Sequence, residues 1–129
     1  MFNSQNFCHL FNLINNLLFF ICGCVVLSQV HSHTEIISNV ILSIHIILVS
    51  LVLTYYEVKN SNYIENKRIL YFYYGLTYLW NGLLLFGLYD VGIAIGIISV
   101  VNGIFNFGIY IISDDTESNL VEQAKTDIV

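Results

Sequence analysis

Charged side chains are scarce in this sequence. Only 10% of the 129 residues are charged, and just four of them are lysine or arginine. A nucleic-acid partner requires clustered basic residues that neutralise phosphates. The formal net charge of −5, without any basic arm, therefore argues against nucleic acid as a partner. Proline is absent as well, a compositional bias from which no function follows.

Cysteine is rare too, and the three that are present, Cys8, Cys22 and Cys24, lie in or beside the first apolar stretch. Their number and spacing fit neither a disulfide framework nor a zinc site. The sequence also lacks a nucleophile with a partnered base, an HExxH pattern, paired intramembrane aspartates and a glycine-rich phosphate loop. We therefore expect no enzymatic activity, no catalytic residues, no metal site and no cofactor.

Apolar residues, by contrast, make up 57% of the chain. They form stretches of about 20 residues that stay apolar around the whole helical circumference, as a lipid environment requires. The expected fold class is an all-α membrane protein, a four-transmembrane-helix bundle whose first partner is the lipid bilayer. The expected spans are residues 10–27, 36–56, 69–88 and 91–112.

The first and last of these spans have distinctive ends. Asn12, Asn15 and Asn16 put amides into the opening turns of the first span. Residues 1–35 contain no lysine or arginine, so a cleaved signal peptide is not expected there. Tyr89 and Asp90 alone separate the last two spans, which predicts a tight antiparallel hairpin.

The basic residues predict the orientation of the bundle. Lys59, Lys67 and Arg68 lie between the second and third spans, and by the positive-inside rule this connection faces the cytosol. Both termini are then expected to be cytosolic. Residues 114–129 are acidic and poor in apolar side chains, which predicts a disordered cytosolic tail after a membrane domain of residues 1–113.

Small residues recur on one face of the fourth span, at steps of four and three along the helix. Within lipid, such a stripe permits close helix packing, either inside the molecule, which we favour, or in a homo-oligomer. Two glycines a heptad apart mark the third span in the same way. The helix-packing residues expected from this pattern are Gly92, Gly96, Ser99, Gly103 and Asn106 on the fourth span, and Gly75 and Gly82 on the third.

Histidines supply the remaining candidates for chemistry. His45 is the intramembrane polar candidate, and an ionisable side chain at that depth is by default a functional-site hypothesis. The simpler interpretation is a neutral imidazole hydrogen-bonded to a neighbouring helix, which we favour. His31, His33 and Glu35 offer either a metal or pH-sensitive site or an ordinary solvated loop, and the solvated loop is preferred.

Three segments together resemble the COPI-associated protein family, the small Golgi membrane proteins with four spans. They are residues 55–59, with the sequence Tyr-Tyr-Glu-Val-Lys, residues 71–82, and the glycine-rich fourth span. In that family the second span ends in an aromatic or aliphatic pair followed by Glu-x-Lys, which Glu57 and Lys59 match. The family also has an acidic tail after its fourth span.

The resemblance covers roughly residues 12–113. In the third span, residues 75–78 fit the family pattern, whereas Tyr73 and Tyr74 stand where that pattern has its first glycine and arginine. The resemblance implies residence in Golgi membranes or Golgi-derived vesicles, a non-enzymatic role in vesicle-mediated transport or membrane organisation, and contact with vesicle-trafficking proteins. One alternative is a small transporter or channel, which the polar residues within the spans favour. Another is an accessory subunit of a membrane complex.

Overall fold

The computed structural model describes residues 4–29, 36–60 and 67–126, and within these ranges the chain is entirely helical. Four α-helices follow one another: α1 (Ser4–Gln29), α2 (Ile36–Asn60), α3 (Lys67–Leu85) and α4 (Tyr89–Thr126). Each predicted span corresponds to one helix, although the third, residues 69–88, runs three residues past the end of α3. The other three helices extend beyond their predicted spans at one or both ends.

Three of the helices contain segments long and apolar enough to cross a membrane. These are residues Asn6–Gln29 of α1, Ile37–Lys59 of α2 and Tyr89–Ser113 of α4. The 19-residue α3 is not among them, because it opens with Lys67 and Arg68 and its composition is rich in tyrosine. A membrane protein with three apolar spanning candidates is thus the description that the fold supports directly.

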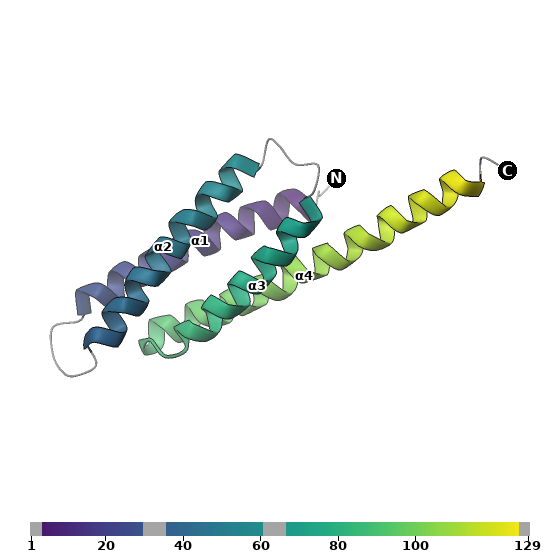
Figure 1. Cartoon of the computed structure of the whole chain (residues 1–129). Helices are drawn as coiled ribbons and strands as arrows, with labels where there is room; N and C mark the ends of the chain where they lie inside the picture. Colours follow the sequence, from purple (N-terminus) through teal and green to yellow (C-terminus); the bar gives the residue numbers. More distant parts are fainter. Residues whose placement is uncertain (1–3, 30–35, 61–66, 127–129) are drawn as a thin grey trace.

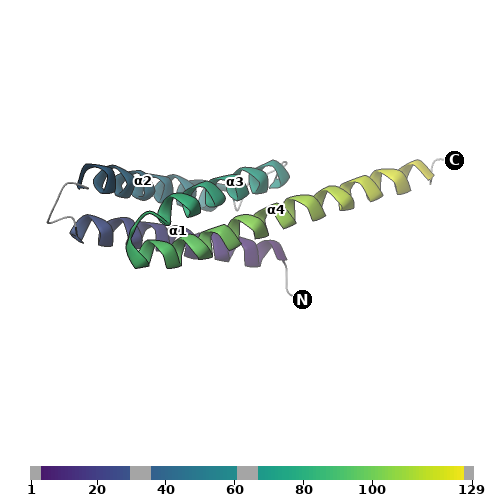
Figure 2. The same cartoon turned by 90° about the horizontal axis from the view of Figure 1, so that it is seen from below.

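The helices form two antiparallel hairpins, α1 with α2 and α3 with α4, and the hairpins meet along α1 and α4. Figure 1 shows the two hairpins side by side, and Figure 2 shows α2 and α3 in one layer above α1 and α4. Within the described residues, α2 and α3 do not share a comparable interface. The bundle is therefore closed on three sides and grooved on the fourth.

The connection between α3 and α4 differs from the predicted one. Residues 86–88 form the turn, whereas Tyr89 and Asp90 already belong to the first turn of α4. The amides of Phe86 and Gly87 donate to the carbonyls three residues earlier, which winds the end of α3 tightly before the chain reverses. Asp90 is then placed at a helix N-terminus, where a carboxylate is favourable.

The C-terminal region also differs from the prediction of a disordered tail, because α4 continues as one helix as far as Thr126. Residues 109–126 contain neither glycine nor proline, and a helix that is already nucleated in the bundle extends at little further cost. In both views α4 runs well past the bundle (Figure 1 and Figure 2). We call residues 114–126 of α4 the C-terminal arm.

The packed core lies where all four helices converge. Its aromatic centre is formed by Phe19 of α1 and Tyr78 of α3, whose ring centroids are 6.0 Å apart. Around them lie Cys22, Val26, Ile46, Leu53, Tyr74, Leu85, Leu88 and Ile95. Most large apolar side chains point outward instead, as in a protein whose surroundings are hydrocarbon.

Candidate functional site in the polar interior

A stripe of polar side chains runs down the buried face of α1. Cys8, Asn12, Asn15 and Asn16 follow the three- and four-residue spacing of one helical face, and each is almost completely buried. The same asparagines that marked the first predicted span as unusual therefore face the interior. A buried amide needs hydrogen-bond partners, and α2, α3 and α4 supply most of them, whereas Oδ1 of Asn15 and Nδ2 of Asn16 have none among the described residues.

Asn12 is the centre of this network. Its Nδ2 donates to Oδ1 of Asn106 at 3.3 Å and lies 3.4 Å from Oε1 of Glu57. Its Oδ1 accepts from Nδ2 of Asn102 at 3.1 Å and from Nδ2 of Asn106 at 2.9 Å. One side chain of α1 thus connects to both α2 and α4. Cys8 adds a further contact, because its thiol donates to Oδ1 of Asn106 at 3.4 Å.

Glu57 ends the network on α2. Only 5% of this residue is exposed, and its Oε1 lies 2.7 Å from Nδ1 of His9 on α1. Its other oxygen, Oε2, is buried without a hydrogen-bond partner. The second span was expected to end at residue 56, which left Glu57 in the connection that follows, whereas the structure turns Glu57 into the bundle. Burying a carboxylate costs desolvation free energy unless the group is paired, and His9 and Asn12 are its partners here.

A second group of bonds ties α1 to α3 and α4 one to two turns deeper. Nδ2 of Asn15 donates to Oγ of Ser99 at 3.2 Å, and Ser99 in turn donates to the carbonyl of Tyr78 at 3.1 Å. The Tyr78 hydroxyl donates to Oδ1 of Asn16 at 2.8 Å. Ser99 therefore bonds to two different helices, α1 and α3.

The predicted packing residues divide between two faces of α4. Gly96 and Gly103 approach the backbone of α3 at Gly82 and Gly75, so closely that a methyl group on Gly96 would come 2.7 Å from the Gly82 carbonyl oxygen. Ser99 and Asn106 join the polar network just described. Gly92 lies in the turn region, where an added methyl group would collide with Leu85. The stripe is thus occupied by contacts within the chain.

His45, the intramembrane polar candidate, lies away from all of this. Its side chain is exposed on the outward face of α2, on the same side as Ile41 and Leu48. We expected the His45 imidazole to be hydrogen-bonded to a neighbouring helix, and within the described residues its outward position brings it to no such partner. His31, His33 and Glu35 lie outside the described residues. Among the residues that the structure describes, no group of three histidine, cysteine or acidic side chains is arranged to hold a metal ion.

The topology determinants gather at one end of the bundle. Lys59 is at the end of α2 and Lys67 and Arg68 begin α3. Arg68 stacks over the Tyr110 ring of α4 at 4.8 Å, and the Nζ of Lys59 lies 3.5 Å from the Tyr55 hydroxyl. The His9–Glu57 contact is at this same end. The beginning of α1, the end of α2, the beginning of α3 and the exit of α4 therefore share one side of the bundle.

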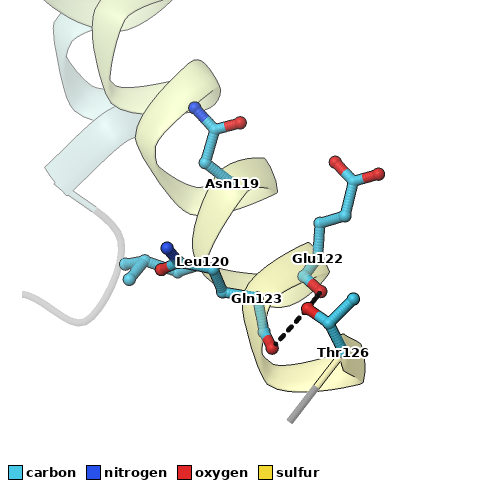
Figure 3. Close-up of a pocket in the computed structure, with 5 residues that line it drawn as sticks. All are labelled: Asn119, Leu120, Glu122, Gln123 and Thr126. Atoms are coloured by element: carbon cyan, nitrogen blue, oxygen red, sulfur yellow. Dashed lines mark hydrogen bonds between the residues drawn. The ribbon is translucent and has the colours of Figure 1, made fainter. Parts of the chain in front are cut away.

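A surface hollow of about 520 Å³ lies on the C-terminal arm (Figure 3). Its lining residues are Asn119, Leu120, Glu122, Gln123 and Thr126, all from α4. The Thr126 hydroxyl donates to the backbone carbonyls of Glu122 and Gln123, as Figure 3 shows. Because one helix alone forms this hollow, it is a concave stretch of surface and offers no enclosed site.

Sequence reasoning missed the Glu57 pair and the Asn12 network, although a signal for the network was present. The spacing of Cys8, Asn12 and Asn15 is the same kind of stripe that was recognised on the fourth span. No such signal existed for Glu57, which lies between a tyrosine pair and a lysine. Comparison with protein-family models, with curated proteins and with solved structures gave no match for this chain.

Proposed function

We propose that the chain is a non-enzymatic integral membrane protein with four spans, in which α3 crosses the bilayer together with the three more apolar helices α1, α2 and α4. The observation that carries this proposal is the inversion of polarity: buried asparagines and Glu57 bond to one another inside, while large apolar side chains cover the outside. In water that arrangement would expose an extensive apolar surface, whereas in lipid it is the expected one. The hydrogen bonds of the polar network then hold the helices of the bundle together.

The position of α3 supports its crossing. It begins beside the end of α2 and runs antiparallel to α4, so it carries the chain from one end of the bundle back to the other. At about 1.5 Å per residue its 19 residues span roughly 28 Å, close to the thickness of the hydrocarbon core. If α2 and α4 both cross the bilayer, the chain needs a return path, and α3 provides it.

The cellular role that we propose is membrane organisation or traffic in Golgi membranes or Golgi-derived vesicles. It rests on the family-like pattern of residues 55–59 and 71–82, together with the acidic arm beyond the bundle. In the structure Glu57 of that pattern contacts His9 and Asn12 of α1. The arm, whose residues 119–126 are exposed, is the surface offered to peripheral proteins in the cytosol.

Extraction and mapping in cells test this proposal. A copy tagged at its C-terminus should resist alkaline carbonate, localise to Golgi or endosomal membranes, and show Lys59, Arg68 and both termini on the cytosolic side. Single cysteines placed at these positions in a cysteine-free variant report the side by reagent accessibility. Residence in the plasma membrane or mitochondria without a Golgi or endosomal pool would remove the traffic role. Release by carbonate would remove the four-span proposal itself.

A second candidate function, proton-coupled transport, is favoured by one observation. Glu57 and His9 are ionisable, bonded to each other, and lie within two of the apolar candidate spans. Ionisable pairs inside membranes often belong to proton pathways. If this pair carries protons, liposomes that contain the full chain should dissipate a pH gradient. Glu57→Gln should abolish that flux, while His45→Ala, on the outward face of α2, should leave it unchanged. Wild-type liposomes without flux would eliminate the candidate.

A further inference from the structure

The open side of the bundle is an apolar groove between α2 and α3. It has a volume of about 480 Å³, within the range of small-molecule sites. Residues from both helices line it: Leu48, Val49, Val52, Leu53 and Tyr56 from α2, and Leu70, Tyr73, Tyr74 and Thr77 from α3. These residues lie in the second half of α2 and the first half of α3. The groove is therefore in the half of the bundle that ends at Lys59 and Arg68.

The lining of the groove suits a hydrocarbon chain. Aliphatic side chains and tyrosine rings form its walls, and the Thr77 hydroxyl is already bonded to the carbonyl of Tyr73 at 2.8 Å. A hydrocarbon chain makes apolar contact with such walls and has no polar group of its own that would need a partner there.

The charge at the end of the groove indicates which lipid. Val52, Tyr56 and Lys59 follow one another at steps of four and three, so the exposed Lys59 lies just beyond the groove at the end of α2, with its Nζ 3.5 Å from the Tyr55 hydroxyl. Three basic residues occur in residues 59–68 against one acidic residue, Glu65. The carboxylate of Glu57 is turned inward to His9 and is 5% exposed. The groove therefore opens toward a positively charged end.

We propose that this groove binds an anionic phospholipid of the cytosolic leaflet. One acyl chain lies between α2 and α3, and the phosphate is held at the bundle end by Lys59, with Arg68 of α3 at the same end. The occupied groove supplies the contact that α2 and α3 do not make with each other. The proposal rests on the four-span arrangement proposed above, because that arrangement brings the groove to the level of the lipid chains.

Native mass spectrometry of the purified full chain in detergent tests the site with two probes, phosphatidylserine and phosphatidylcholine of identical acyl chains. The wild-type protein should retain one phosphatidylserine and prefer it to phosphatidylcholine. Val52→Trp fills the groove and should weaken phosphatidylserine binding about tenfold or more. Val101→Trp is the matched control, since Val52 and Val101 are both 53% exposed and Val101 lies on α4 outside the groove. This variant should bind as the wild type does.

Lys59→Gln separates the headgroup from the chain. One lysine near an anionic headgroup is worth about 1 kcal/mol, so phosphatidylserine binding should fall about fivefold while phosphatidylcholine binding stays unchanged. Equal binding of the two lipids by the wild type, or undiminished binding by Val52→Trp, would overturn the proposal. So would a change from dimer to monomer mass in Val52→Trp, because that outcome assigns the groove to a second copy.

The outcome is distinguishable from failure of the four-span proposal, which carbonate extraction measures separately. If the protein resists carbonate but binds both lipids equally, only the lipid-site proposal is wrong. If carbonate releases the protein, the four-span proposal is wrong, and the groove no longer lies in the membrane.

Discussion

Gly103→Ala is expected to destabilise the bundle by about 2 kcal/mol. The added methyl group would come 2.9 Å from the Gly75 carbonyl oxygen and 3.0 Å from the Leu79 amide nitrogen. Both are backbone atoms of α3 and cannot rotate away, so the hairpin must open, and overpacking of this kind costs about 1–3 kcal/mol. The loss occurs although alanine is the better helix former. Unfolding in mixed micelles, followed by helical circular dichroism during titration with SDS, measures the free energy.

Gly108→Ala is the control for this prediction. Gly108 is on the same helix, five residues further on, and a methyl group there meets no atom within 4 Å. Without a collision only the helix propensity remains, which favours alanine over glycine by up to about 1 kcal/mol. The two identical substitutions should therefore change stability in opposite directions. If both raise it equally, the close approach of α3 and α4 at Gly103 and Gly75 is incorrect.

Asn12→Leu is expected to cost about 2–3 kcal/mol, because it removes the hub through which α1 bonds to α2 and α4. Asn102 loses the acceptor of its amide, Asn106 loses two bonds, and Glu57 loses one of its two partners. Each buried polar group left without a partner costs about 1–3 kcal/mol, while interhelical hydrogen bonds in membranes average nearer 0.6 kcal/mol. The same SDS titration measures the loss.

Asn6→Leu is the matched substitution for this second prediction. Asn6 is on α1 as well, but its side chain is exposed, so the change to leucine should alter the free energy of unfolding by less than about 0.5 kcal/mol. Rescue provides a further check on the network. In Asn12→Leu the substitution Asn102→Leu should cost less than it does alone, because the acceptor of its amide is already gone. Additive costs would show that the two side chains do not interact.

The helices themselves were predictable from sequence because an uncharged stretch of about 20 residues has few other solutions. The close contact of α3 and α4 was predictable too, since the heptad spacing of Gly75 and Gly82 has a counterpart in Gly96 and Gly103. The turn was not placed correctly, because Gly87 and the polar pair Tyr89 and Asp90 are equivalent turn signals and only the winding of the last residues of α3 distinguishes them.

The polar interior shows where sequence reasoning reached its limit. Composition indicates that amides occur in a span but does not say which face they occupy. The sequence of α2 indicates His45 as its polar candidate, whereas the buried ionisable residue of that helix is Glu57. The two residues differ in register alone: Glu57 is on the face of α2 that turns toward α1, whereas His45 points outward. Such a difference depends on which side of α2 its neighbours occupy, and that is settled only once the four helices are assembled.

One continuous helix, α4, contains both the polar residues of the interior and the C-terminal arm. Asn102 and Asn106 anchor its inner half, and residues 114–126 continue the same rod by roughly 20 Å beyond the bundle. A partner that binds the arm and tilts it would therefore strain the hydrogen bonds around Asn12. Binding at the end of the arm and the stability of the bundle are therefore coupled through this single helix.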